Sequence, residues 1–342
     1  MNCVACGSMR TKKDGEVEGY VAGSSYTIYS CETCATKWCF PHVAGKEVYD
    51  LIYSHRDGAP GYARYAQYAR DVLKTRNPLR FISSQEEMYY AVVKEIKQNL
   101  ETKGTILDVG CGLGYLTYAL HQSGYEATGI DISLEAIQQA RKIYGNYFVC
   151  DDFFLFKGSE GGYDVICMLE LIEHVDNPKA YISKALMLLK PGGLLIVTTP
   201  NRSFFTKEAL WNTELPPVHL NWFSEDGIRS LAENLSLSVN FFDFTSYNIL
   251  HGDLNTSTNG ESSQRTSIFS EEGKPLYEPY VKSRLRIVTE KLHIYPPLKT
   301  IRHVKRKTFE FSKILLSSKT LYQKRSNILC VTMRRREKNV VV

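Results

Sequence analysis

The stretch that decides the fold is Thr105-Ile-Leu-Asp-Val-Gly-Cys-Gly-Leu-Gly114. It joins a short apolar run, interrupted by Asp108, to three glycines, and a helix-like segment follows. A strand that enters a helix through a glycine turn lets backbone N–H groups approach a ligand closely. The dinucleotide pattern Gly-x-Gly-x-x-Gly does not fit, because its third glycine would fall on Tyr115 or Thr117. The pattern is instead Asp-x-Gly-x-Gly-x-Gly.

Strand-like and helix-like runs alternate after this turn, which is typical of a parallel sheet covered by helices on both faces. Asp131 ends the second expected strand, 21 residues beyond Gly110. At that place an acid can accept hydrogen bonds from ribose hydroxyls. With the first strand at 105–109, the expected strands are 126–131, 148–153, 163–169, 189–201, 237–244 and 327–333.

Several motifs occur in the order typical of class I S-adenosylmethionine-dependent methyltransferases, which the chain resembles over residues 85–245. The motifs are Asp108–Gly114, Gly129-Ile-Asp131, Asp151-Asp152, Glu173-His174-Val175 and Leu189-Lys-Pro-Gly-Gly193. The resemblance implies an α/β fold with a Rossmann-like seven-stranded methyltransferase sheet and helices on both faces. It also implies S-adenosylmethionine as the cofactor.

The resemblance further implies which residues bind this cofactor. The glycine turn would admit its methionine part, and Asp108 would hold the amino group, directly or through water. Asp131 would bind the ribose hydroxyls, although an acid at the end of a strand can also act as a cap for the turn. Ile132 and the 151–153 segment would surround adenine. The expected cofactor-binding residues are Asp108, Gly110, Gly112, Gly114, Asp131, Ile132, Asp151, Asp152 and Phe153.

A second constellation combines Glu170-Leu-Ile-Glu173-His174 with His219. It resembles two groups of metal-assisted O-methyltransferases, of ubiquinone biosynthesis and of small-RNA ends, whose matching residues are thought to hold magnesium near the acceptor hydroxyl. We therefore expect Glu173, His174 and His219 to be catalytic, and these three with Glu170 to be candidate magnesium ligands. Magnesium normally prefers oxygen ligands. The alternative is a metal-free site in which His174 orients the acceptor or backbone.

Two Cys-x-x-Cys pairs near the N-terminus, Cys3/Cys6 and Cys31/Cys34, have the spacing of a zinc site. Thiolates are preferred zinc ligands, and the segment 20–29 between the pairs would form the hairpin of a zinc ribbon. Cys39 and His42 are spare ligands, and the alternative is that the cysteines are free or redox-active. We expect a structural zinc with no open position.

Residues 48–77 are rich in tyrosine and arginine. They could line the mouth of a substrate site or form ordinary amphipathic helices. A helical period also marks residues 84–100, directly before the first core strand.

The net charge of +5 is unevenly distributed, because residues 281–342 carry +14 and the remainder −9. The segment 252–263 is rich in serine, threonine, asparagine and glycine, which predicts a mobile loop. The pattern of residues 301–315 predicts a basic amphipathic helix. That helix could contact an anionic membrane, cover the active site or pair with the acidic body. The acidic balance of the body disfavours nucleic acid. We recognise no signal peptide and no membrane-spanning apolar run in this sequence, so we expect a cytoplasmic location, with peripheral membrane contact as the alternative.

We expect five segments: a zinc-ribbon-like segment at 1–45, a helical lead-in at 46–100, the methyltransferase core at 101–250, the insertion at 251–325, and the last strand with a basic tail at 326–342. With an N-terminal ribbon, the chain resembles bacterial enzymes of the ubiquinone-methyltransferase-like group. The expected reaction is in-line methyl transfer to a hydroxyl, or a carbon, of a small-molecule, sugar or lipid-linked intermediate. Alternatives are an RNA methyltransferase, and a non-catalytic zinc-ribbon interaction protein.

Overall fold

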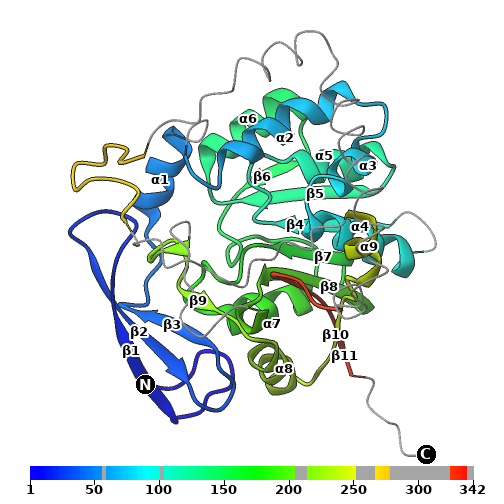
Figure 1. The fold of residues 1–342 in the computed structure, drawn as a ribbon. Coiled ribbons are helices and arrows are strands. Elements are labelled where there is room, and N and C mark those ends of the chain that lie inside the picture. The colour runs from blue at the N-terminus through cyan, green and yellow to red at the C-terminus, as the bar shows by residue number, and fades with distance from the viewer. Residues whose placement is uncertain (56–58, 101–103, 205–213, 252–265, 278–323, 337–342) are drawn as a thin grey trace, which may run out of the picture.

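The computed structural model describes residues 1–55, 59–100, 104–204, 214–251, 266–277 and 324–336. Its centre is a seven-stranded sheet in the order β10-β11-β8-β7-β4-β5-β6 (Figure 1). The parallel strands are β4 (Thr105–Val109), β5 (Glu126–Asp131), β6 (Phe148–Cys150), β7 (Tyr163–Leu169) and β8 (Leu189–Pro200). β11 (Ile328–Arg335) runs antiparallel to both β8 and β10 (Leu237–Phe241). The expected Rossmann-like sheet is confirmed.

Two apolar cores cover the two faces of this sheet. Ile106 packs with helices α4 (Glu87–Asn99), α5 (Tyr115–Gln122) and α6 (Leu134–Tyr144), whereas its neighbour Leu107 packs with α7 (Pro178–Leu188) and α8 (Glu225–Asn234). In β7, Val165 packs in the same core as Ile106, and Ile166 packs in the same core as Leu107. Successive side chains of a strand point to opposite faces, so these unbroken apolar runs supply both cores.

The N-terminal segment forms an antiparallel sheet of β1 (Thr11–Glu18), β2 (Ser25–Cys31) and β3 (Lys37–Phe40). A fourth strand, β9 (Asn221–Trp222), comes from the part of the chain that forms the seven-stranded sheet and pairs antiparallel with β3. Figure 1 shows this sheet at one side of the molecule, joined to the body through β9. We call residues 1–45, which contain β1–β3, the two cysteine pairs and His42, the ribbon. No local pattern marks β9, because its pairing joins residues far apart in the sequence.

The segment between the ribbon and β4 is helical. It contains α1 (Lys46–Ser54), α2 (Ala63–Asp71), the 3₁₀ turn η1 (Val72–Lys74) and α3 (Pro78–Ser83), followed by α4. Pro78 begins α3, and the Asn77 side chain caps it by accepting a hydrogen bond from the Arg80 N–H at 3.0 Å. Proline suits a first helical turn, where its missing N–H has no intrahelical partner.

The remaining short elements are η2 (Arg202–Phe204) and α9 (Thr245–His251). Phe269 packs on Tyr20 of the ribbon and on Ile52 of α1. The expected mobile segment 252–263 and the basic helix 301–315 lie outside the described residues. Within the described part of the chain, no helix is both long and apolar enough to cross a bilayer.

Candidate active site

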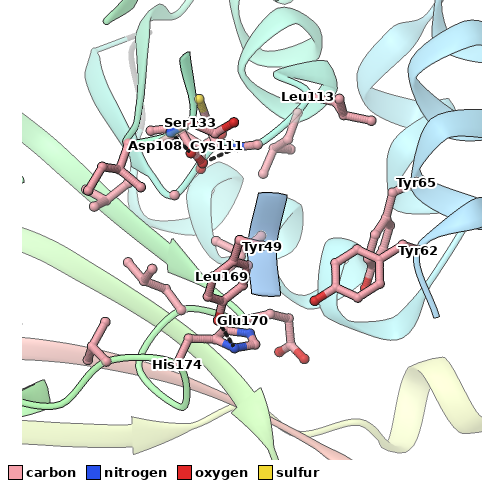
Figure 2. Close-up of a pocket in the computed structure, with 18 of the residues that line it drawn as sticks. Tyr49, Tyr62, Tyr65, Asp108, Cys111, Leu113, Ser133, Leu169, Glu170 and His174 are labelled. Atoms are coloured by element: carbon pink, nitrogen blue, oxygen red, sulfur yellow. Dashed lines mark hydrogen bonds between the residues drawn. The ribbon is translucent and has the colours of Figure 1, made fainter. Parts of the chain in front are cut away.

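A cavity of about 690 Å³ lies at the carboxyl ends of β4, β5 and β7 (Figure 2). The glycine turn after β4 forms one wall, and tyrosines of α1 and α2 form the opposite one. In open parallel sheets, ligands bind outside the carboxyl ends of the strands, so this is the expected place for a site. The volume is in the range of small-molecule and cofactor pockets.

The three glycines of the turn serve different purposes. Gly110, Gly112 and Gly114 have φ values of 76°, 50° and 74°, a region that favours glycine. A Cβ on Gly114 would lie 2.5 Å from the Phe148 ring, so the absence of a side chain there permits close packing. A Cβ on Gly112 would meet nothing nearer than the Tyr53 hydroxyl at 4.0 Å. Gly112 therefore keeps cavity space open, whereas Gly114 is required by the core.

Two acids flank this turn. The Asp131 carboxylate accepts hydrogen bonds from the N–H groups of Gly112 and Ser133, both at 2.8 Å. The Asp108 carboxylate accepts one from the Thr117 hydroxyl at 2.7 Å. Burial raises the pKa of Asp108 to about 6, against the lowering effect of Thr117, and burial also raises the pKa of Asp131. Asp131 thus fixes the turn, and both acids line the cavity.

The expected adenine wall also borders the cavity. Ile132 is 64% exposed, as expected for an apolar side chain that a flat ligand could cover. Phe153 is buried and stacks on Tyr181, with ring centroids 5.6 Å apart. Asp151 and Asp152 accept backbone hydrogen bonds from Asp152 and Phe154, at 2.9 and 2.7 Å. All four residues line the cavity, and their contact with adenine stays a prediction.

Glu173, His174 and His219 come together, with their candidate ligand atoms all within 4.8 Å of one another, and the two histidines line the same cavity. We call these three residues the Glu/His cluster. The Glu173 side chain is buried, and neither carboxylate oxygen has a hydrogen-bond partner within normal distance among the described residues. Burial, together with the charges of Glu170 and Glu214, raises the pKa of Glu173. Burying a carboxylate without a partner costs folding free energy, so we expect Glu173 to bind a cation or a hydrogen-bond donor.

Glu170, the fourth expected magnesium ligand, is not part of the cluster. Its carboxylate accepts a hydrogen bond from the Thr198 hydroxyl at 3.0 Å, and burial raises its pKa to about 7. It still lines the cavity (Figure 2).

Hydrogen bonds determine which nitrogen of His174 carries the proton. Its Nδ1 lies 2.6 Å from the Val218 carbonyl oxygen, which can only accept. The Tyr49 hydroxyl donates to the same carbonyl at 3.1 Å and lies 3.0 Å from Nδ1 (Figure 2). Nδ1 is therefore protonated, and Nε2, which lies 3.9 Å from a Glu173 oxygen, has a free lone pair.

Both imidazoles of the cluster are neutral at pH 7. Burial lowers the pKa of His174 to about 4, and burial with the neighbouring His174 lowers the pKa of His219. Nδ1 of His219 has no hydrogen-bond partner in the described part of the chain. A carboxylate and two neutral imidazoles match the ligand set of a divalent cation, and imidazole favours iron, nickel, copper or zinc over magnesium.

Some tyrosines of the 48–77 segment line the cavity and others pack in the core, so both roles that the sequence left open occur. Tyr49, Tyr53, Tyr62 and Tyr65 line the cavity. Tyr68 instead packs against the core and donates a hydrogen bond to Glu86 at 2.9 Å. Both groups lie on amphipathic helices, so spacing alone could not separate them.

Glu214 also lines the cavity and was not singled out from the sequence. It is buried, and burial with the charge of Glu170 raises its pKa. No motif surrounds it, so no local signal could have identified it.

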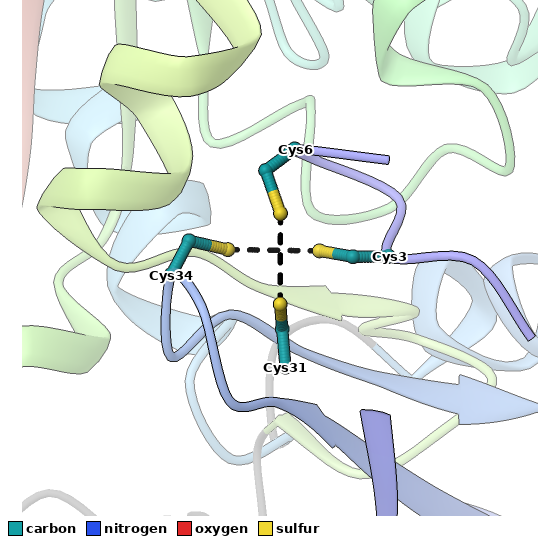
Figure 3. A group of neighbouring side chains, drawn as sticks. All are labelled: Cys3, Cys6, Cys31 and Cys34. Carbon is teal, nitrogen blue, oxygen red and sulfur yellow. Dashed lines mark hydrogen bonds between the residues drawn. The ribbon is translucent and has the colours of Figure 1, made fainter. Parts of the chain in front are cut away.

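The four N-terminal cysteines converge, as expected for a metal site (Figure 3). The sulfur atoms of Cys3 and Cys34 are 3.6 Å apart, and those of Cys6 and Cys31 are 3.5 Å apart. The spare ligands lie elsewhere. Cys39 is buried in a separate apolar cluster, and His42 forms a hydrogen bond with Asn221 at 2.8 Å. Four sulfurs at this spacing fit tetrahedral zinc.

Comparison with known proteins agrees with this architecture. Residues 84–239 match the family described as "Methyltransferase domain". A ubiquinone biosynthesis O-methyltransferase of Coxiella burnetii is 38% identical over 119 residues, which cover 33% of this chain and 50% of that protein. One from Hydrogenovibrio crunogenus is 35% identical over 113 residues, covering 31% and 46%. The chain thus spans about half the length of these curated relatives.

Solved structures similar to this chain include a SAM-dependent methyltransferase from Thermotoga maritima, entitled a possible histamine N-methyltransferase. It aligns with a TM-score of 0.40 at 21% identity, covering 57% of this chain and 85% of that chain. A SAM-dependent methyltransferase from Archaeoglobus fulgidus aligns with a TM-score of 0.40 at 14% identity, covering 72% and 93%.

Proposed function

Because the chain carries a class I S-adenosylmethionine-dependent methyltransferase domain at residues 84–239, we propose that the protein methylates a hydroxyl group of a small-molecule acceptor. The observation that carries this proposal is that His174 and His219 of the Glu/His cluster line the same cavity as the glycine turn. Cofactor-binding and proton-accepting groups therefore face one shared cavity. The curated relatives named as O-methyltransferases favour oxygen over carbon as the methylated atom.

In this proposal the cofactor lies across the carboxyl ends of β4 and β5. S-adenosylmethionine, when bound, supplies a methyl group that its sulfonium already activates. Gly110 and Gly112 leave room for its methionine part, and Asp108 faces the amino group. Asp131, held by two backbone N–H groups, accepts from the ribose hydroxyls, and Ile132 with the 151–153 segment encloses adenine. The main task of the protein is then to position the acceptor oxygen in line.

The Glu/His cluster would remove the proton from that oxygen. Nε2 of His174 is unprotonated, and Nδ1–H bonded to Val218 keeps the ring in this orientation. In the alternative arrangement, in which Nε2 of His174 binds a metal and not the proton, Glu173, His174 and His219 would hold a divalent cation, magnesium or a transition metal, which would lower the pKa of an acceptor hydroxyl. Glu173 is placed to compensate the positive charge that develops on His174 or arrives with the cation.

The charge of the cavity favours an uncharged, hydroxyl-bearing acceptor such as a sugar or a lipid-linked intermediate. Glu170 and Glu214 line it. Arg64 is the one lysine or arginine among its described lining residues, and Glu86 accepts its Nε–H at 2.6 Å. A phosphate or carboxylate next to the reacting hydroxyl would therefore meet carboxylates, whereas hydroxyl donors would be accepted.

We also propose that the four converging cysteines bind one structural zinc ion. No sulfur position is left open in a four-thiolate site, so this zinc would contribute stability and no chemistry.

Isothermal titration with S-adenosylmethionine tests the proposal, using untreated protein and protein stripped of divalent ions. We expect micromolar-order binding that stripping does not change, because the cofactor residues include none of the Glu/His cluster. Absence of binding by untreated, folded protein would contradict the methyltransferase proposal and favour a non-catalytic interaction protein. Retention of RNA in moderate salt would favour the RNA-methyltransferase alternative.

A further inference from the structure

The side chain of Asn221 lies between the ribbon and the Glu/His cluster and is completely buried. Its Nδ2 donates to the carbonyl oxygens of Val175 at 2.8 Å and Ile172 at 3.3 Å. Carbonyls can only accept, so the amide orientation is determined and Oδ1 faces His42. Nε2 of His42 therefore donates to Oδ1, at 2.8 Å. One side chain thus bonds to the ribbon segment and to both sides of the Glu173–His174 pair.

The backbone makes the same connection. The carbonyl oxygen of Glu173 accepts hydrogen bonds from the N–H groups of Leu220 at 2.8 Å and Asn221 at 3.1 Å. On the other side, the N–H of Cys39 in β3 donates to the Leu220 carbonyl at 3.0 Å. Since Leu220 directly follows His219, two members of the cluster depend on this one segment for their position.

The cysteine group is joined to the same segment a few residues further on. Ser224 caps α8 by accepting from the Gly227 N–H at 2.9 Å, and its hydroxyl donates to the Cys34 carbonyl oxygen. Thr36 adds a contact to the Ser224 hydroxyl at 3.3 Å. Cys34 belongs to the group in Figure 3, and β3 follows it directly, pairing with β9 through Trp38 and Asn221. The ribbon therefore contacts the 220–224 segment at both ends.

We propose that the ribbon positions the Glu/His cluster, and that Asn221 is the positioning residue through which it does so. The inference rests on the proposed role of the cluster in methyl transfer. Loading of the cysteine site with zinc would then control the geometry of the cluster without contacting cofactor or acceptor. Partners that orient metal-binding side chains typically change metal affinity by about 10- to 100-fold when they are removed.

The test compares variants of the full chain. Asn221→Asp keeps the shape but places an acceptor against the carbonyls of Ile172 and Val175. His42→Ala removes the ribbon donor, and His42→Gln restores a donor. His121→Ala is the matched control, because that histidine stacks on Tyr147 and does not line the cavity. A further sample is the unsubstituted protein from which a chelator has removed the zinc, with the chelator then removed. It tests the loss of the ribbon's metal without any substitution.

Three readouts are measured for each protein: Mn²⁺ affinity by electron paramagnetic resonance, the His174 tautomer by ¹⁵N NMR of labelled histidine, and S-adenosylmethionine affinity by calorimetry. We expect Asn221→Asp, His42→Ala and zinc-free protein to bind Mn²⁺ about 10- to 100-fold more weakly. We also expect these three to populate the Nε2–H tautomer of His174 and to keep their cofactor affinity. His42→Gln and His121→Ala should match the unmodified protein.

Unchanged Mn²⁺ affinity and an unchanged tautomer in His42→Ala and in zinc-free protein would overturn the inference, even if Asn221→Asp failed to fold. If the unmodified protein binds no Mn²⁺, an unchanged His174 tautomer in His42→Ala and in zinc-free protein is enough to overturn the inference. Loss of cofactor binding by the unmodified protein is a different result, because it removes the proposed function itself.

Discussion

Asp108 is only 3% exposed, and Thr117 supplies the hydrogen bond that its carboxylate accepts. Burial moves its pKa from an ordinary value of 3.8 to about 6. The folded state therefore binds this proton more tightly than the unfolded state does. The stabilisation that results is complete below about pH 4 and is lost as the pH rises through 6. At neutral pH the buried charge opposes folding, and in the proposed function it would bind the cationic amino group of the cofactor.

We predict that Asp108→Asn abolishes S-adenosylmethionine binding and makes the ligand-free protein more stable at pH 8, by about 1–3 kcal/mol. The substitution removes a buried charge and keeps a hydrogen-bonding side chain. Urea unfolding at pH 5 and pH 8, with calorimetry, measures both effects. The stability gain should shrink at pH 5. Equal destabilisation at both pH values, with binding intact, would contradict the assignment.

The contrast between Gly112 and Gly114 leads to a second prediction. Gly114→Ala should destabilise the protein by about 3 kcal/mol or more, because strain at positive φ adds to overlap with Phe148. Gly112→Ala should cost only about 1–2 kcal/mol of strain but weaken cofactor affinity at least tenfold, since its methyl group would enter the cavity. Thermal unfolding and calorimetry on both variants provide the comparison. A reversed order of the two stability losses would show that the glycines have other roles.

At the scale of elements, the ribbon is bound to the body at several places. β9 completes its sheet, and Cys3, Cys31, Cys34 and Trp38 belong to the same apolar core as α7 and α8. Loss of order in the ribbon would therefore expose part of the methyltransferase core. Residues 1–45 are therefore a separate segment of the sequence but not an independent structural unit, because they share a sheet and an apolar core with the body.

We predict one zinc ion per chain, measured by elemental analysis. Cys31→Ser should lose the zinc and about 3 kcal/mol or more of stability, because binding energy at a structural site is folding energy. Cys39→Ala is the matched control, since this cysteine is buried outside the cluster and its replacement should leave the zinc in place. Full zinc content in Cys31→Ser would show that the four sulfurs do not form the site.

The whole molecule combines an acidic body with a basic segment near the C-terminus. Residues 281–342 carry +14, against −9 for the rest of the chain. A basic amphipathic helix binds anionic lipid surfaces, and this attraction weakens as salt screens it.

We therefore predict that the full chain sediments with vesicles containing phosphatidylserine and is released by salt. Pure phosphatidylcholine vesicles should not bind it. Replacing Lys305, Arg306 and Lys307 with glutamate should reduce binding about 100-fold or more, since each basic residue near the surface contributes about 1 kcal/mol. Equal binding to neutral vesicles would exclude an electrostatic contact. Absence of binding to both kinds of vesicle would favour the alternative that the basic segment pairs with the acidic body.

Much of the cofactor side of the cavity could be predicted from the sequence. Glycines in a turn, acids at strand ends and apolar runs of strand length are local patterns, and a parallel sheet brings the ends of successive strands together. The Glu/His cluster was predicted in part: Glu173, His174 and His219 converge, whereas Glu170 points to Thr198. Spacing shows that two residues are near each other in the chain, but hydrogen bonding decides where each side chain points.

The sequence by itself determined the seven-stranded fold, the glycine turn with Asp108 and Asp131, and the two cysteine pairs, because each is encoded within a few consecutive residues. Only the tertiary structure decided that β9 completes the ribbon, that Glu214 and four tyrosines of the 48–77 segment line the cavity, and that Asn221 joins the ribbon to the Glu/His cluster. These contacts join segments as far apart as residues 42 and 221. No local pattern encodes them, since their energy exists only when the packed core brings the segments together.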